Sequence, residues 1–217
     1  MTDATGSRDA APGGAAADPD TEAVRLARGG DQGAFERIVV GHQRRIFNVA
    51  HRILGDHDEA LELTQEVFIQ AHRSLGQFRG EARFGSWLLA IAVNQCRNRL
   101  KLWKRRARSK HDSLSAPVGE EDSGLRRELP DPGPSAVEAL EGRQLEELVR
   151  AQLQNVDEEY RTVLVLRDVQ GVPYDEIARV LGIPIGTVKS RLHRGRTELR
   201  ALISRRLAPR DGREEGR

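Results

Sequence analysis

The chain has 217 residues, of which 38% are hydrophobic and 31% charged, and its formal net charge is +2. This composition is typical of a soluble helical protein, and no apolar run approaches the roughly 18 residues that span a bilayer. The single cysteine, Cys96, excludes an internal disulfide and any metal site built from several cysteines.

Aromatic residues make up only 4% of the chain, which argues against a β-sandwich or barrel. The N-terminus lacks a basic segment followed by an apolar core, so no secretory signal is predicted. We therefore expect a cytoplasmic protein with no cofactor and no metal.

The first predicted segment is a disordered tail, residues 1–20, rich in Ala, Gly, Pro and Asp. Residues 21–54 carry apolar side chains at helical spacing, with a break at Gly29 and Gly30. Residues 58–74 are predicted to form an amphipathic helix. Its buried face is predicted to hold Leu61, Val67, Phe68 and Ala71.

A third strong helical pattern, "FGSWLLAIAVNQCRNRLKLW", is predicted to begin at a Ser86 cap. Together these helices form one predicted unit, residues 21–110. Residues 111–135 lose the periodicity and hold four of the nine prolines, and residues 112–147 carry a local charge of −7. This pattern predicts a flexible acidic linker, either a solubilising spacer or a regulatory segment.

A second helical unit is predicted over residues 136–207, followed by a basic tail, residues 208–217. Asp157 is the predicted cap of one of its helices, and Pro173 lies in the first turn of another. No segment alternates as a strand does. The predicted fold is therefore all-α, with two small helical domains joined by the linker.

The stretch "GIPIGTVKSRLHRGRTELR", residues 182–200, predicts the second half of a helix-turn-helix. Gly182 ends the preceding helix, and Pro184 is tolerated near the start of the next one because its missing N–H would be unpaired there. An apolar stripe is predicted to pack on Ile177, Val180 and Leu181. Its members are Ile185, Val188, Leu192, Gly195, Leu199 and Leu202.

The opposite side of this helix is polar and basic. It presents Ser190, His193, Arg194 and Thr197, flanked by Lys189, Arg191 and Arg196. Most charged helix faces are merely solvated, but here the turn, the stripe and the charge agree. The pattern favours binding to phosphates and base edges in the major groove of DNA.

A second basic cluster lies between residues 97 and 110, with eight Lys or Arg and no acid. Phe78, Phe84, Trp87 and Trp103 lie before or within it. Aromatic side chains beside a cationic track are typical of single-stranded nucleic-acid binding, although such aromatics are more often part of a core.

The motifs "TQEVF", "FGSWL", "IAVN" and "EIARVLGIPIGTVKSRL" together resemble the extracytoplasmic-function (ECF) sigma factors of bacterial RNA polymerase, members of the sigma-70 family. The first half of the chain resembles their promoter-melting region two, and the second half resembles their region four. The resemblance implies an RNA polymerase sigma factor that recognises the −35 and −10 promoter elements, initiates transcription, serves a stress or envelope response, and is not an enzyme.

The resemblance also assigns roles to residues of this chain. Residues implied to dock on core polymerase are Asp58, Glu62, Gln65 and Glu66. Residues implied to bind the −10 element are Phe78, Arg79, Trp87, Asn94, Arg97, Asn98 and Lys101. Residues implied to bind the −35 element are Thr187, Lys189, Ser190, Arg191, His193, Arg194 and Arg196.

Implied partners are core RNA polymerase, through its β′ clamp helices and β flap, promoter DNA, and an anti-sigma factor that is often membrane-anchored in this family. No small-molecule substrate is implied. Two alternatives remain open from the residues alone. A stand-alone helix-turn-helix regulator would share the second unit, and an enzyme acting on nucleic acid would need a ligand set or nucleophile motif that the sequence lacks.

Overall fold

The computed structural model describes residues 18–111 and 136–208, and within these ranges it contains helices and no strand. The all-α prediction is confirmed for this part of the chain. Most of the predicted tail (residues 1–17), the acidic linker from residue 112 onward and residues 209–217 lie outside the described residues. In the described ranges, no helix has the length and apolar character that crossing a membrane requires.

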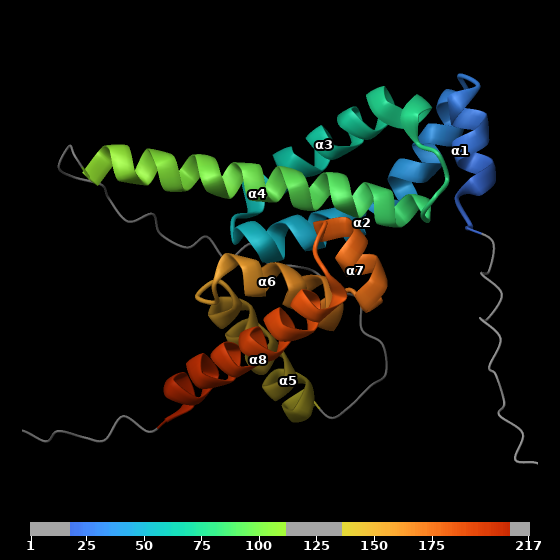
Figure 1. Ribbon diagram of the computed structural model, residues 1–217. Coiled ribbons are helices and arrows are strands. Elements are labelled where there is room, and N and C mark those ends of the chain that lie inside the picture. Colours follow the sequence, from blue (N-terminus) through green and yellow to red (C-terminus); the bar gives the residue numbers. More distant parts are fainter. Residues whose placement is uncertain (1–17, 112–135, 209–217) are drawn as a thin grey trace, which may run out of the picture.

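Residues 18–111, here called the first unit, form a helical bundle (Figure 1). Its elements are α1 (Thr21–Arg28), α2 (Gln32–Leu54), α3 (His57–Ser74), the 3-10 turn η1 (Leu75–Gln77) and α4 (Phe84–His111). Helices α2, α3 and α4 pack against one another, and α1 packs on α2. The side chains of Asp31 and Asp56 cap α2 and α3, which satisfies backbone N–H groups that a helix start leaves unpaired.

The start of α4 differs from the prediction. The helix begins at Phe84, whose backbone N–H donates to the Asp18 carboxylate at 2.6 Å. Ser86 lies inside the helix and is buried, so its predicted role as a cap was wrong. The acceptor comes instead from a residue distant in sequence, and Asp20 reinforces this connection through His42 at 2.8 Å.

Aliphatic side chains of α2, α3 and α4 fill the core of the first unit. The fully buried ones include Ile38, Ile46, Val49, Ile53, Leu63, Val67, Leu88 and Leu89. Leu61, which was predicted to be buried, is 43% exposed. The prediction was wrong because Leu63 and Val67 make the contact with the bundle, and no described element fully covers the side of α3 that carries Leu61.

Cys96 is fully buried in this core. Burial raises the pKa of its thiol to about 12, because a charged thiolate is poorly solvated there. The thiol therefore stays protonated at neutral pH and serves as a small apolar side chain rather than a redox group.

Residues 136–208, the second unit, carry the helix-turn-helix. Its elements are α5 (Ala136–Leu153), α6 (Glu158–Leu164), the π-helical segment η2 (Val165–Val169), α7 (Tyr174–Leu181) and α8 (Ile185–Leu207). Asp157 caps α6 as predicted. Gly182 ends α7 with φ +64°, a left-handed conformation that favours glycine. The predicted turn between α7 and α8 is therefore confirmed.

The apolar stripe of α8 follows the prediction except at its first member. Val188, Leu192 and Gly195 are buried, and Leu199 and Leu202 pack against the core. Ile185 is 44% exposed, so its predicted burial was wrong. It is the first residue of α8 and precedes the part of the helix that α6 and α7 cover.

Gly195 lies at the crossing of α8 and α6. A Cβ atom at this position would lie 3.0 Å from the Tyr160 Cβ and 3.0 Å from the Leu164 Cδ1. We expect Gly195→Ala to destabilise the second unit by ~1 kcal/mol, because overpacking outweighs the better helix propensity of alanine. Thermal unfolding followed by circular dichroism measures this change.

Gly186 provides the matched control. It lies on the same helix, and a Cβ there would have no heavy atom within 4 Å. Gly186→Ala should therefore stabilise the helix by up to ~1 kcal/mol. If Gly195→Ala stabilised the protein equally, the close approach of α6 and α8 would not depend on glycine.

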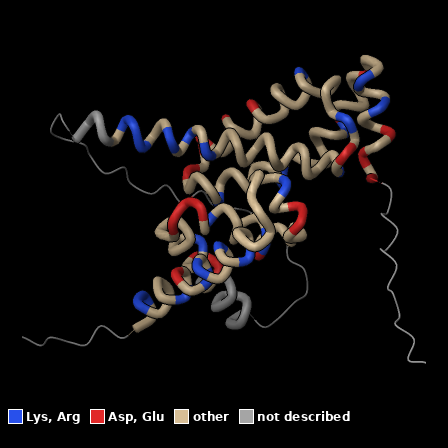
Figure 2. The backbone as a smooth tube through the Cα atoms, in the orientation of Figure 1, with Lys and Arg blue, Asp and Glu red and all other residues tan. Residues whose placement is uncertain are grey.

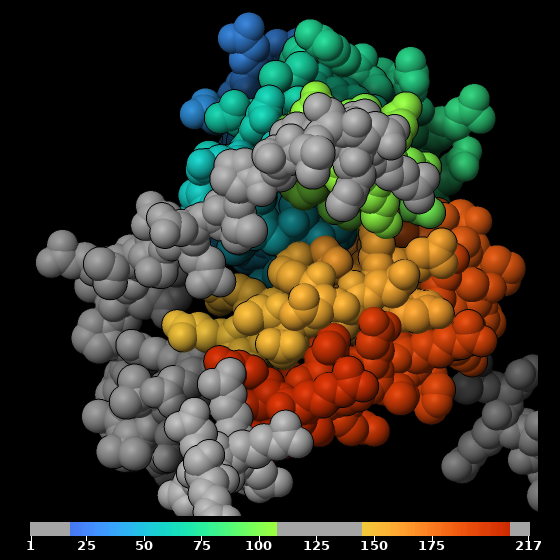
Figure 3. Space-filling model, turned by 90° about the vertical axis from the view of Figure 1, so that its left-hand side faces the viewer, coloured from blue at the N-terminus to red at the C-terminus, as the bar shows by residue number. Residues whose placement is uncertain are grey.

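The two units pack against each other. Helix α7 lies against α4, while α6 and η2 lie against α2. The buried apolar side chains of both units form one continuous cluster. Figure 1 shows the second unit beside α2 and α4, and the space-filling view shows the two units in direct contact (Figure 3).

Candidate nucleic-acid interface

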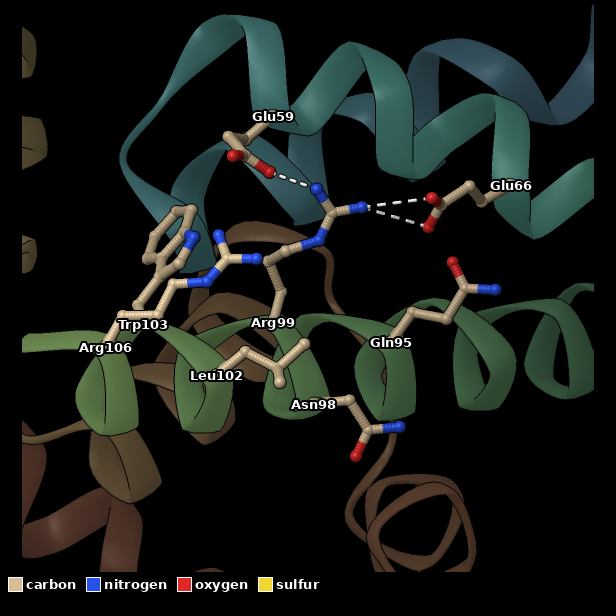
Figure 4. A pocket seen from close by; sticks show the side chains of 8 residues that line it. All are labelled: Glu59, Glu66, Gln95, Asn98, Arg99, Leu102, Trp103 and Arg106. Carbon is tan, nitrogen blue, oxygen red and sulfur yellow. Dashed lines mark hydrogen bonds and ion pairs between the residues drawn. The ribbon is translucent and has the colours of Figure 1, made fainter. Parts of the chain in front are cut away.

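Four of the residues predicted to bind the −10 element lie along α4. Asn94, Asn98 and Lys101 are exposed and Arg97 is half-buried. Their spacing of three and four residues places them on one side of the helix, and we call them the α4 stripe. Figure 4 shows Asn98 pointing away from α3, and Figure 2 shows Lys and Arg continuing toward the C-terminal end of α4.

Arg99, on the other side of α4, faces three carboxylates of α3. Its guanidinium contacts Glu59 and lies 3.1 Å from a carboxylate oxygen of Glu62 and 3.1 Å from one of Glu66. Figure 4 shows the contacts with Glu59 and Glu66. Only 18% of the Arg99 side chain is exposed. A cation surrounded by three carboxylates on a neighbouring helix holds α3 and α4 together, so this member of the basic cluster is structural.

The predicted core-docking residues share the outer side of α3. Asp58 and Gln65 are exposed, and the Glu62 and Glu66 side chains remain 62% and 45% exposed beside Arg99. Sequence reasoning missed two apolar residues near this surface, Leu61 and Ile69, which are 43% and 51% exposed. Their positions resemble ordinary members of an amphipathic pattern, so only the structure reveals them.

Three aromatic rings cluster where η1 leads into α4. Phe78, Phe84 and Trp87 have ring centroids 5.3–5.4 Å apart. Phe84 is fully buried and Phe78 is 9% exposed, whereas Trp87 is only partly buried. Arg79 follows, with 83% of its side chain exposed. The partly exposed Trp87 indole and the exposed Arg79 guanidinium therefore lie beside the buried rings of Phe78 and Phe84.

Trp103 does not join this cluster. It lies with Glu59, Glu66, Asn98 and Arg99 around a separate cavity of about 380 Å³ between α3 and α4 (Figure 4). The structure therefore separates Trp103 from the other three aromatics that the sequence grouped with the basic track.

The outer side of α8 presents the predicted −35 residues Lys189, Ser190, His193 and Arg194, all of which are exposed. We call these four the α8 face. Thr187 is half-buried one turn nearer the N-terminus. The α8 face lies opposite the buried Val188–Leu192–Gly195 stripe, which is the geometry of a recognition helix.

Two of the predicted DNA-binding arginines are instead anchored within the second unit. Arg191 is only 19% exposed and pairs with Glu159 at 2.6 Å. Arg196 donates to both oxygens of Asp168, at 2.6 and 2.9 Å. The hydrogen bonds and charge of Asp168 raise the pKa of Arg196. These two pairs hold α8 against α6 and η2, and so orient the α8 face.

The fold and these surfaces define a class of protein. A helix-turn-helix with a basic outer face is combined, in one chain, with a polar and basic helix beside an aromatic cluster. The first arrangement suits duplex DNA, and the second suits unstacked bases of single-stranded DNA. The class is therefore that of helical proteins whose surfaces suit both duplex and single-stranded DNA.

Comparisons with known proteins identify the family. Residues 38–108 match the family model "Sigma-70 region 2", and residues 146–199 match "Sigma-70, region 4". The chain is 36% identical over 179 residues to the RNA polymerase sigma-H factor of Pseudomonas aeruginosa, covering 82% of this chain and 90% of that one. It is 32% identical over 177 residues to the ECF RNA polymerase sigma-E factor of Escherichia coli K12, with the same coverage. The chain belongs to the sigma-70 family, as an ECF sigma factor.

Solved structures share the fold. The sigma factor RpoE of Bartonella quintana, solved with the anti-sigma factor NepR, has a TM-score of 0.60 and 19% identity, covering 78% of this chain and 96% of that one. CnrH, solved with the cytosolic domain of CnrY, has a TM-score of 0.59 and 23% identity, covering 86% and 97%.

Proposed function

We propose that this protein directs core RNA polymerase to specific promoters, with residues 136–207 recognising the −35 element and residues 21–110 melting the −10 element and docking on the enzyme. The observation that carries this proposal is the combination of the exposed α8 face with the α4 stripe and the partly exposed Trp87, in a chain of the ECF family. It acts as a binding subunit, not an enzyme, in the cytoplasm, where the polymerase works.

Recognition of the −35 element rests on the α8 face. Lys189, Ser190, His193 and Arg194 carry donors on the exposed side of a helix that fits the major groove. Arg191 and Arg196 support this face through their ion pairs with Glu159 and Asp168. We assign these two arginines a positioning role alongside the phosphate or base contacts that the family resemblance implies.

Melting of the −10 element rests on the first unit. Trp87 offers a stacking surface for an unpaired base, with Arg79 beside it, and the α4 stripe offers donors to the adjoining strand. The outer side of α3 docks on core polymerase, its carboxylates supplying charge and the exposed Leu61 and Ile69 supplying apolar contact. Because Ile69 lies on this docking surface and not among the predicted DNA-binding residues, Ile69→Lys should weaken binding to core polymerase and leave DNA binding unchanged.

An anti-sigma factor is the third proposed partner. The structurally similar sigma factor of Bartonella quintana was solved with the anti-sigma factor NepR. We propose that a protein of this kind, in some cases anchored in the membrane, occupies surfaces of this chain that core polymerase also uses.

Run-off transcription tests the function. Bacterial core polymerase is mixed with a pool of promoter fragments, with and without this protein. Specific start sites that appear only when the protein is present support the proposal, and their upstream sequences supply the two elements. Tight duplex binding by the protein alone, without specific initiation, would favour the stand-alone regulator.

Arg194→Ala tests the α8 face. We expect it to reduce discrimination between a cognate and a mutated −35 element by about 1–3 kcal/mol, the usual contribution of a side chain that reads a base. Transcription from both promoters with the reconstituted holoenzyme measures this loss. Arg200→Ala, at another exposed position of α8, is the control, and equal losses on both promoters would reduce Arg194 to a phosphate contact.

A further inference from the structure

The connection from η1 to α4 carries two of the residues predicted to bind the −10 element, Phe78 and Arg79. Residues 78–83 belong to no helix, so no helical hydrogen-bond ladder holds them in place. The Phe78 ring lies beside Trp87, with ring centroids 5.3 Å apart. This placement therefore depends on how the two ends of the connection are fixed. We call residues 76–84 the capture loop.

Asp18 fixes the end of the capture loop that leads into α4. The Oδ2 atom of its carboxylate accepts the Phe84 backbone N–H at 2.6 Å, and Oδ1 accepts the Asp20 backbone N–H at 3.1 Å. The Asp18 carbonyl also accepts the Thr21 hydroxyl at 2.8 Å. The carboxylate is thus held at the start of α1 and serves as the cap of α4, where a negative charge also suits the positive end of the helix dipole.

Asp20 and His42 pack around the same end of the loop. The Asp20 carboxylate lies 2.8 Å from His42 Nε2, and the His42 and Asp20 side chains are only 14% and 19% exposed. The edges of the His42 and Phe84 rings meet, with centroids 6.0 Å apart. A Cβ atom on Gly85 would lie 3.3 Å from the His42 ring. The first turn of α4 is therefore closely packed between α2 and the residues that begin α1.

Arg28 fixes the other end of the capture loop. It is the last residue of α1, and its guanidinium donates to the Gly76 carbonyl at 3.0 Å. Helix α1 packs on η1 as well as on α2, and its Val24 is buried in the core. Figure 1 shows α1 running beside the connection from α3 to α4. One anchored helix of eight residues therefore contacts the capture loop at both of its ends.

We propose that α1 serves as a brace for base capture, in which Asp18 and Arg28 are positioning residues that hold the capture loop ready for an unpaired base of the −10 element. This inference rests on the proposed function for the role of the loop. Neither positioning residue touches the DNA. Both act through Phe78, Arg79 and Trp87, because a loop that is already ordered loses less conformational entropy when the base binds.

Two pairs of substitutions test the brace. Asp18→Ala removes the acceptor at the start of α4, whereas Asp18→Asn keeps one, and asparagine caps helices about as well as aspartate. Arg28→Ala removes the donor to Gly76, whereas Arg28→Lys keeps a cation that can donate to a carbonyl. Glu22→Ala and Arg25→Ala are the matched controls, because these residues pair with each other on the exposed side of α1. Circular dichroism verifies that each variant is folded.

Hydrogen exchange of the full chain, followed by mass spectrometry, measures the brace without DNA. We expect peptides that cover the capture loop to exchange about fivefold faster in Asp18→Ala, the usual consequence of losing one helix cap. Asp18→Asn should return them toward the wild-type rate, and the two controls should leave them unchanged. Peptides of α3 should keep their rate in every variant. Equal acceleration in α3 would overturn the proposal, because Asp18 would then stabilise the whole first unit.

Transcription by the reconstituted holoenzyme tests the link to base capture. We expect Asp18→Ala to lower transcription from a duplex promoter about fivefold, through the loss of the same cap, and to affect a template already unpaired at the −10 element much less. In a Trp87→Ala background the substitution should lose most of its effect, because residues that act through one another are not additive. A purely structural residue would cause its full loss in either background.

Unchanged exchange of the capture loop in both Asp18→Ala and Arg28→Ala would overturn the brace, and so would full additivity of Asp18→Ala with Trp87→Ala. Failure of the proposed function looks different. Without promoter-specific transcripts from the wild-type protein, the proposed function would fail whatever the exchange rates were, and base capture would fail with it. Normal transcription by the wild type with unaffected exchange in the variants would leave the proposed function standing and remove only the brace.

Discussion

Replacing Phe84 by alanine is expected to lower the free energy of unfolding of the first unit by about 3–5 kcal/mol. Phe84 is fully buried, and its ring contacts Phe78 and Trp87. Its backbone N–H, at the start of α4, donates a hydrogen bond to the Asp18 carboxylate. Removing the ring leaves a cavity beneath both aromatic neighbours. Since typical domains are stable by only about 5–15 kcal/mol, this loss is a large share of the total.

The two tryptophans of the chain, Trp87 and Trp103, both lie in the first unit. Their fluorescence during urea unfolding therefore reports on that unit. Val40→Ala is the matched control, because Val40 is an apolar residue of the same unit that is 64% exposed, and its truncation should change the stability by less than about 0.5 kcal/mol. Similar effects of the two substitutions would show that the aromatic cluster is not a packed element of the core.

The helices could be predicted from the sequence because their signals are local. Asp157 and Gly182 act within a few residues of themselves, and the apolar spacing of α8 is visible in one dimension. One exception is Ser86, whose predicted place as the cap of α4 is taken by the distant Asp18. The others, Leu61 and Ile185, are apolar residues whose burial depends on which neighbouring element covers them. A periodic pattern does not show where the neighbouring element stops covering a helix, so the exposure of Leu61 and Ile185 could be found only from the structure.

The roles of charged residues were less predictable than their positions. Arg194 and Arg196 look equivalent in the sequence, yet Arg196 forms an ion pair with Asp168, which lies 28 residues earlier, while Arg194 makes only a long hydrogen bond, 3.5 Å, to the Tyr160 hydroxyl. The contacts of Arg161 could not be predicted from the sequence, because three of its four acceptors are backbone carbonyls, which every residue possesses. Contacts between distant segments depend on tertiary packing, and for that reason the bonds from Gln154 and Arg161 to the carbonyls at the end of α2 could not be predicted from the sequence.

Replacing Trp87 by alanine is expected to reduce transcription from a duplex promoter by about 10- to 100-fold, while a template already unpaired at the −10 element should lose much less. Stacking of one base on an aromatic side chain contributes about 1–3 kcal/mol, and each 1.4 kcal/mol corresponds to a factor of ten. On duplex DNA this energy helps to hold the base outside the helix. On the pre-melted template the bases are already unpaired, so transcription depends less on the stacking energy that Trp87 contributes.

The ratio of transcription from the two templates distinguishes a role in base capture from a general loss of folding or activity. Trp103→Ala, on the same helix but outside the aromatic cluster, should lower transcription from both templates alike if it has any effect, because Trp103 contacts the α3–α4 cavity and not the cluster. Trp87→Phe should restore most of the duplex activity, since it keeps an aromatic surface over Phe78 and Phe84. If Trp87→Ala lowered transcription equally from both templates, the indole would have no role in melting. Trp87 would then be a packing residue that contributes only to stability.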